Sequence, residues 1–446
     1  MRSYLFFLFQ TMWLLGQLLC PVSGWSETLS LDNAIETGLS ESPLLKSAGH
    51  EVKAAFHGKQ AAMGEFMPRI DAYAGYMRGS DPAAVVPIKE FGGRSPVFSR
   101  DHYSYGLAMT IPIFEGGRNW TRLSLAEISE AISRESLHLS RQELVAGITN
   151  TFNRILYLEE LVKSRNTVLE AVKKARADVK VRLDVGRVPP VDLMHMDTRV
   201  AFDEQALTSA MEESERTRRL LARMLGREPS WSFEPIGVLG EPSDNDTPLA
   251  LSIDIENRPD IRKARKQVEL ARKQVELMQG YHLPTLALSG DYGRRAGSGF
   301  EGDEEVWQAG VGLTFNLFSG GAVEARIHQA RASALAAEEK LRQARLVAMT
   351  EVENAMSAIR ESRKRFVAAE TALESAREAW RIEKLKYDAG AGTVTDCLLA
   401  QASWSDAAAS RLGALYAYHA ALVAWRLAAG IIDAGYGRCV EGRTGR

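Results

Sequence analysis

Side chains capable of catalysis or metal binding are scattered along this sequence and form no recognisable motif. The 446 residues contain no His-Glu-x-x-His, no Cys-x-x-Cys and no phosphate-binding loop. Only His50 and His57 among the eight histidines are close in sequence, and we interpret them as solvated or packing residues. The Gly-rich segment 290–293 lacks the strand–helix–strand unit of a nucleotide site. The sequence therefore predicts no catalytic residue, no cofactor and no metal site.

Two aspartates occupy equivalent places in a repeated pattern. Asp192 follows Gly186 by six residues, and Asp396 follows Gly390 by six residues. A carboxylate just after a turn favours capping of the next helix N-terminus. The residues alone leave open whether these aspartates do more than cap a helix.

Composition excludes several classes of protein. The chain is 45% hydrophobic and 25% charged, which is ordinary for a folded protein. Its 55 basic and 57 acidic residues give a net charge of −2, without the basic excess of a nucleic-acid-binding protein. Three cysteines are too few for a disulfide framework. Beyond the first 20 residues, no stretch approaches the roughly 18 apolar residues that a spanning helix needs.

The N-terminus has the pattern of a secretory signal peptide. Arg2 precedes an apolar core over 4–19, and small residues at Val22 and Gly24 suit a signal peptidase. We expect cleavage after Gly24, so that residues 1–24 are removed. The alternative is a lipoprotein acylated at Cys20, although the residues before it lack the usual small side chain.

The mature chain is a tandem duplication. Residues 113–117 recur at 317–321, and 184–186 recur at 388–390, both at an offset of 204. We predict a first repeat over 25–240, a second repeat over 241–435 and a short C-terminal tail over 436–446. Each repeat runs helix, strand, strand, long helix, helix, beginning with helical stretches at 32–66 and 259–281.

Four strands are predicted, two in each repeat. First strands are expected at 70–77 and 285–293, and second strands at 103–113 and 307–317. In 103–113 and 307–317, apolar residues alternate with small or polar ones over about eleven residues. This is the pattern of an outer-membrane barrel strand, although a single such strand would also fit a half-buried sheet of a soluble protein. The loops over 79–101 and 294–305 are expected outside the cell.

Very long helices follow the strands. Gly117–Gly186 contains no proline and one internal glycine, and Gly321–Gly390 contains neither. A helix of this length spans about 100 Å. Core positions recur every seven residues, at Ile148, Ile155 and beyond, which predicts left-handed supercoiling. After the glycine turns, helices are expected at 192–225 and 396–429.

Four strands cannot close a barrel within one chain. Closure removes the unpaired strand edges that lipid cannot satisfy, so a homo-oligomer is predicted. Three copies would supply twelve strands and a continuous helical tube. The expected fold is mainly α with β: an internally duplicated protomer, an antiparallel coiled-coil tunnel and four strands of a 12-stranded trimeric transmembrane β-barrel.

The sequence resembles the TolC family of outer-membrane efflux channels over essentially the whole mature chain. The duplication, the strand-to-helix junction over 111–117 and the two glycine turns carry the resemblance together. It implies a trimer in the outer membrane of a Gram-negative bacterium, in contact with lipid and with a periplasmic extension. It implies as partners a periplasmic adaptor and an inner-membrane pump of the RND or ABC type.

The resemblance also implies roles for particular residues. The adaptor would dock at the helix tips, and carboxylates would line a closed periplasmic aperture, forming a ring that attracts cations. Strand–helix junctions are expected at the paired glycines. These expectations cover the tips Val185, Gly186, Arg187, Ala389 and Gly390; the aperture Asp192 and Asp396; and the junctions Gly116, Gly117, Gly320 and Gly321. Arg187 stands where the family usually has Leu, and Leu399 stands where the family can have a second aspartate.

Two other classes of function remain as alternatives. A periplasmic coiled-coil scaffold or adaptor would explain the heptads but leaves the alternating strands without a role. An exported enzyme would require a catalytic constellation that the sequence does not offer. Within the channel interpretation the cargo stays open, since drugs, metal ions and secreted polypeptides all use this architecture.

Overall fold

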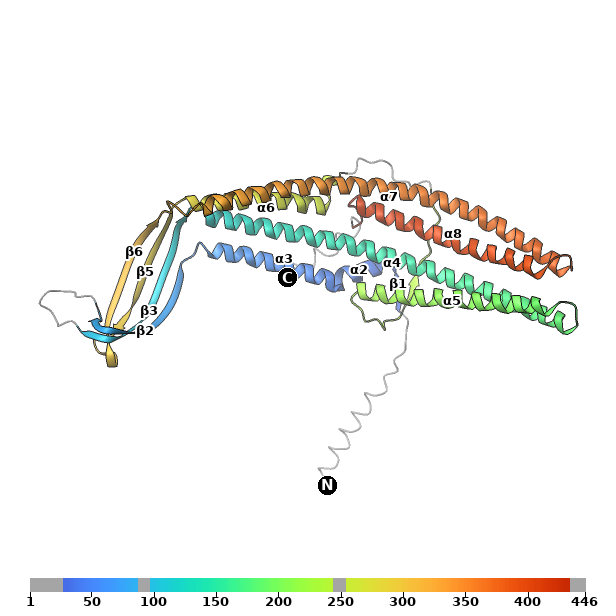
Figure 1. Ribbon diagram of the computed structural model, residues 1–446, viewed down its shortest axis with the longest axis horizontal. Helices are drawn as coiled ribbons and strands as arrows, with labels where there is room; N and C mark the ends of the chain where they lie inside the picture. Colours follow the sequence, from blue (N-terminus) through green and yellow to red (C-terminus); the bar gives the residue numbers. More distant parts are fainter. Residues whose placement is uncertain (1–26, 87–96, 244–253, 434–446) are drawn as a thin grey trace, which may run out of the picture. The chain divides into compact units, whose positions relative to one another are not determined.

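The computed structural model describes residues 27–86, 97–243 and 254–433 (Figure 1). The predicted signal peptide, Cys20 and the C-terminal tail lie outside these residues. In chain order, the main elements are β1 (Glu27–Ser30), α2 (Leu31–Glu41), α3 (Pro43–Gly64), β2 (Arg69–Ala84), β3 (Phe98–Glu115), α4 (Arg118–Asp184), α5 (Pro190–Met224), β4 (Phe233–Ile236), α6 (Pro259–Gln279), β5 (Thr285–Ala296), β6 (Glu304–Thr314), α7 (Ala322–Asp388) and α8 (Val394–Ala428). Short 3-10 turns are η2 (Ile255–Asn257), η3 (Gly280–His282) and η4 (Ser298–Phe300).

The duplication extends to the element boundaries. Helices α4 and α7 each have 67 residues, and α5 and α8 each have 35. Every boundary of these four helices repeats at the offset of 204 that the sequence showed. The long helices were predicted to within two residues because glycine ends them at both termini. Each contains about 100 Å of helix.

Four strands form one antiparallel sheet in the order β2-β3-β5-β6 (Figure 1). Strands β3 and β5 pair on both sides, so β2 and β6 are the edges. Strands β2 and β3 extend into the predicted 79–101 loop, to Ala84 and back to Phe98. The prediction for the last strand was wrong at its end: β6 stops at Thr314, not at Leu317. Its only partner, β5, begins opposite Thr314 at Thr285, so the next residues have no ladder to join.

Large apolar side chains of this sheet are exposed. On β3, Leu107 is 52% exposed and Ile113 is 55% exposed. On β6, Trp307, Val311 and Leu313 are each exposed by 64% or more. The alternating pattern therefore does not mark a half-buried soluble sheet, because no described element covers these side chains.

Two local features differ from the sequence prediction. The helical stretch expected over 32–66 is broken at Ser42, because Pro43 disfavours the helical conformation of the residue before it. A parallel pair of four-residue strands, β1 with β4, was not predicted at all. Such short strands carry no readable alternation, and their pairing joins residues about 200 positions apart.

The chain separates into two compact units, and each contains parts of both repeats. The first unit comprises 27–38, 147–242 and 363–420, and the second comprises the described parts of 39–146, 243–362 and 421–433. The unit boundaries fall inside α2, α4, α7 and α8 and just before residue 243. The division into repeats therefore describes the ancestry of the sequence, whereas the compact units describe its packing.

Heptad positions form the core of each unit. In the first unit, Ile148 and Ile155 are fully buried, and Phe366 packs with Ala369, Ala414 and Leu415. In the second unit, Val352 and Ala355 pack against Ala428. Among the described residues, no helix is both long and apolar enough to cross a membrane.

Candidate functional site

The turn between α4 and α5 is built on a left-handed glycine. Gly186 has φ +74°, and the Arg187 N–H donates to the Arg182 carbonyl at 2.8 Å. This bond from the residue after the glycine back into the last helical turn is a Schellman C-cap. Val185 is 64% exposed, and Gly186 and Arg187 are exposed beside it. The three predicted tip residues of the first repeat thus form one accessible turn.

The turn between α7 and α8 repeats this geometry. Gly390 has φ +76°, and the Ala391 N–H donates to the Lys386 carbonyl at 2.8 Å. Ala389 and Gly390 are exposed. A Cβ at Gly186 or Gly390 would meet no atom within 4 Å, so glycine is required there for its backbone conformation and not for space.

Thr393 caps α8, and Asp396 lies in the first turn of that helix. The Asp396 N–H donates to Thr393 Oγ1 at 3.1 Å, which is an N-cap hydrogen bond, and the Thr393 hydroxyl donates to Asp396 Oδ2 at 2.7 Å. The Asp396 side chain remains exposed while its carboxylate accepts this bond.

Asp192 holds the matching position in α5 with a different environment. Its N–H donates to the Pro189 carbonyl at 3.1 Å, and Pro189 has no hydroxyl to complete a capping box. Asp192 is half-buried and lies close enough to Tyr387 to contribute to raising the pKa of that phenol, after the larger effect of burial. The two aspartates are therefore equivalent in sequence but not in environment.

The two helix pairs are joined near their turns by residues that sequence reasoning missed. Arg182 of α4 lies 3.4 Å from the Asp388 carboxylate of α7, and its guanidinium lies 4.9 Å from the Tyr387 ring centroid. Beneath them, Val179, Met196 and Val394 form a buried cluster. Arg182 and Asp388 are 206 residues apart, so no local pattern could have indicated their contact.

The four predicted junction glycines stand between a strand or its extension and a long helix. Gly116 and Gly320 both have φ +61°, and Gly117 and Gly321 have φ +73° and +78°. A Cβ at Gly116 would also lie 2.9 Å from Leu283 Cβ, so this position needs glycine for space as well. The paired glycines turn the chain within two residues, so α4 begins directly after Gly117 and α7 begins directly after Gly321.

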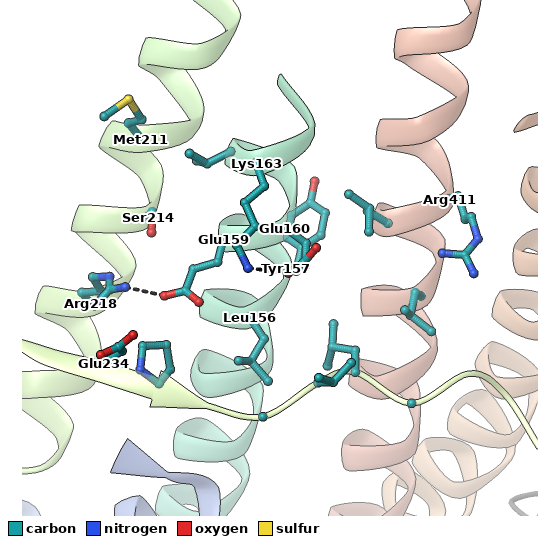
Figure 2. A pocket seen from close by; sticks show the side chains of 18 of the residues that line it. Leu156, Tyr157, Glu159, Glu160, Lys163, Met211, Ser214, Arg218, Glu234 and Arg411 are labelled. Carbon is teal, nitrogen blue, oxygen red and sulfur yellow. Dashed lines mark hydrogen bonds and ion pairs between the residues drawn. The ribbon is translucent and has the colours of Figure 1, made fainter. Parts of the chain in front are cut away.

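A cavity of about 950 Å³ in the first unit lies between α4, α5, α8 and the segment after β4 (Figure 2). Arg218 donates to the Glu159 carboxylate, and Lys163 donates to Glu160 at 2.8 Å. Burial raises the pKa of Glu159 even though Arg218 opposes the shift. Glu159 and Glu160 are thus paired with neighbouring cations, which is the arrangement of structural ion pairs.

Metal binding has no support in the described part of the chain. Within 27–86, 97–243 and 254–433, no cluster of three or more His, Cys, Asp or Glu side chains could hold a metal ion. His57, one of the two histidines close in sequence, pairs instead with Gln60, at 2.8 Å.

Comparisons of the sequence and of the fold with known proteins both find outer-membrane proteins. The model of the family described as "Outer membrane efflux protein" matches residues 34–227 and 250–431. TolC of Salmonella enteritidis is 23% identical over 420 residues, covering 91% of this chain and 82% of that protein. Two solved outer-membrane proteins share the fold. VceC of Vibrio cholerae has a TM-score of 0.75 and 20% identity, covering 90% of this chain and 96% of that one. CmeC of Campylobacter jejuni has a TM-score of 0.78 and 19% identity, covering 90% and 85%.

The first prediction concerns Cys397 in the first turn of α8. Burial, and secondarily Asp388, raises the pKa of this half-buried thiol. A raised pKa lowers the thiolate fraction near neutral pH, so alkylation of Cys397 should be slow at pH 7 and accelerate at higher pH than for an exposed thiol. The measurement is the rate of N-ethylmaleimide labelling against pH in a Cys439→Ser variant. The matched control carries Cys397→Ser, Cys439→Ser and Ala391→Cys, which places a thiol on the exposed turn. Equal pH profiles for the two thiols would contradict the prediction.

Proposed function

The chain belongs to the outer membrane efflux protein family, and we propose that three copies of it close into one conduit, through which a pump in the inner membrane exports its substrates. The protein is an outer-membrane efflux channel of a Gram-negative bacterium. The proposal adds its oligomeric state, its partners, its aperture residues and its gating at the periplasmic end.

The exposed apolar sheet carries the proposal. Trp307, Val311 and Leu313 on β6 and Leu107 on β3 would be costly in water but suit the hydrocarbon of a membrane. Within the part of the chain that the structure describes, β2 and β6 each pair with a strand on one side, and lipid cannot satisfy the backbone groups on the other side. Pairing β2 of one copy with β6 of the next satisfies both rows, and three copies give a closed barrel of twelve strands.

The long helices would form the periplasmic part of the conduit. In the first unit, α5 packs along α4 through ion pairs such as Arg154–Glu213 at 2.6 Å, and α8 packs along α7 through Trp380 and Trp404, whose stacked rings lie 4.8 Å apart. Seven-residue spacing of the core supports supercoiling of such pairs around a central axis. A trimer would contain six pairs, enough to surround a tunnel.

The exposed turns are the proposed docking site for the periplasmic adaptor. All the residues of the proposed site are exposed, and their backbone N–H groups donate within their own helix ends; they are Val185, Gly186 and Arg187 on the first turn, and Ala389 and Gly390 on the second. Arg187 adds a positive charge to an otherwise apolar turn. We therefore expect the adaptor surface to include an acidic or carbonyl acceptor opposite Arg187.

Asp396, with Asp192 as the weaker candidate, is proposed to line the periplasmic aperture. Threefold symmetry would bring three copies of the exposed Asp396 carboxylate around one axis, where they attract cations and disfavour anions. The Arg182–Asp388 contact joins the two helix pairs close to this position and would oppose their separation. Gating would then consist of separating these pairs.

Planar-bilayer conductance of the purified mature protein, with the detergent-solubilised mass measured on the same sample, tests the proposal. A species of three chains that forms discrete cation-preferring channels would support it. A monomer or dimer without conductance, even after Asp396→Asn, would overturn the trimeric conduit and favour a periplasmic scaffold.

A second prediction separates the charge of Asp396 from its capping role. Asp396→Asn removes the charge but keeps an oxygen that accepts from Thr393, so cation preference should fall severalfold while the melting temperature stays within about 2 °C. Thr393→Ala is the matched control, because it removes the capping bond and keeps the charge. It should lower the melting temperature slightly and leave cation preference unchanged. Selectivity that follows the cap and not the charge would remove Asp396 from the aperture.

A third prediction concerns docking. Gly186→Trp places a large side chain on the exposed turn, and export that depends on the pump should be lost while trimers still form in the membrane. Gly186→Asn is the control, because Asn tolerates the left-handed conformation and adds little bulk. Normal export by the Trp variant would show that the adaptor does not contact this turn.

A further inference from the structure

A second, smaller cavity in the first unit lies among all four helices near the turns. Its volume is about 160 Å³. Its walls come from the last part of α4, the first part of α5, the last part of α7 and the first part of α8. The apolar lining residues are Ala171, Ala175, Met196, Trp380, Val394 and Leu398. A cavity of this size accommodates a molecule with a single aromatic ring.

Two buried polar groups on its wall have no partner. The Tyr387 hydroxyl and the Gln401 side-chain amide nitrogen are both buried, and neither makes a hydrogen bond within the described chain. Gln401 is 4% exposed, so its side chain is withdrawn from solvent along with the nitrogen. Buried donors are almost always satisfied in native proteins, and an unsatisfied pair on one cavity wall indicates a bound species that supplies acceptors.

The cavity offers mainly donors to such a species. Tyr387 and Gln401 present an O–H and an N–H₂ group, and the Cys397 thiol is a third, weaker donor on the same wall. Burial raises the pKa of both Tyr387 and Cys397, so both keep their protons at neutral pH. The charged groups that line the cavity are exposed and balance in sign; they are Lys174, Lys384, Asp178 and Asp388.

We propose that this four-helix cavity binds a small aromatic molecule that carries a carboxylate or carbonyl oxygen. The ring occupies the apolar space beside Trp380 and Met196, and the oxygen accepts hydrogen bonds from Tyr387 and Gln401. Because α4, α5, α7 and α8 all contribute to the wall, the bound molecule holds the two helix pairs together. The site is therefore a place where a small molecule stabilises the arrangement of the helices near the turns.

Benzoate is the probe for this site, and benzylamine is its matched control of similar size. Benzoate should raise the melting temperature of the detergent-solubilised protein. At about ten times its dissociation constant, it should slow labelling of Cys397 in the Cys439→Ser variant about tenfold. Benzylamine offers a cationic donor where the site needs an acceptor, so it should do neither. Equal effects of the two compounds, or no effect of benzoate, would overturn the proposal.

Two isosteric variants test the donors themselves. Gln401→Met and Tyr387→Phe approximately keep the shape of the wall; the first removes the whole amide and the second removes only the hydroxyl. Tyr387→Phe should raise the melting temperature of the protein without benzoate, because a buried group without a partner is lost. Each should also weaken benzoate binding about fivefold. If the variants lower the melting temperature and leave benzoate binding unchanged, the groups are held by water and the cavity is not the proposed site.

These measurements use protein in detergent and need no pump, adaptor or membrane potential. A failure of benzoate binding would therefore leave the trimeric conduit untouched. Conversely, a scaffold without conductance could still bind benzoate in this cavity.

Discussion

Among the described residues, no strand pairs with the outer sides of β2 and β6, where backbone N–H and C=O groups lie. In water, solvent molecules form hydrogen bonds with the backbone groups of such an edge. In hydrocarbon, each unpaired group costs several kcal/mol. The side chains of the same sheet favour hydrocarbon over water, since Trp307 and Leu313 are exposed and no described element covers them. Closure by further copies of the chain meets both conditions together. In the proposed trimer, the threefold axis and the conduit of matching helices both depend on this requirement of the sheet edges.

In a symmetric trimer, the residues at the ends of the long helices would be repeated around the axis. The duplication places a glycine turn and a following aspartate at each of these ends. Both glycine turns use the same Schellman geometry, and both following helices carry an aspartate at the same position. The environments of the two aspartates differ. The Thr393 hydroxyl donates to Asp396 and leaves its carboxylate exposed, whereas Pro189 has no hydroxyl to offer Asp192, whose charge contributes to raising the pKa of Tyr387. Asp396 is thus exposed to solvent, and Asp192 is half-buried.

The contact between the pairs is chemically mixed. Arg182 reaches both Asp388 and the face of Tyr387, and an exposed ion pair of this kind contributes little on its own. The cluster of Val179, Met196 and Val394 supplies the apolar contact beneath it. A small cavity adjoins this cluster, with Met196 and Val394 common to both, so the apolar packing between the helix pairs is incomplete there. A ligand in that cavity would restore the missing contacts.

Much of this architecture was readable from the sequence because its determinants are local or repeated. Glycine with positive φ ends each long helix, proline begins α5, and the seven-residue spacing of Ile148 and Ile155 marks the buried stripe. The alternation in 103–113 and 307–317 identified β3 and β6. Prediction failed where a strand depends on the strand it pairs with. The end of β6 is Thr314 because β5 begins opposite it. The β1 and β4 strands form by pairing with each other across about 200 residues.

The sequence by itself determined the order and length of the four long helices, the order of the four sheet strands and the positions of the glycine turns, because backbone conformation and hydrophobic period are properties of neighbouring residues. Only the tertiary structure decided which side chains meet across the repeats. Arg182 with Asp388, Arg182 with the Tyr387 ring, and the cluster of Val179, Met196 and Val394 all depend on how helices distant in sequence pack. Side-chain contacts of that kind are fixed by geometry in three dimensions, and no period along one chain encodes them.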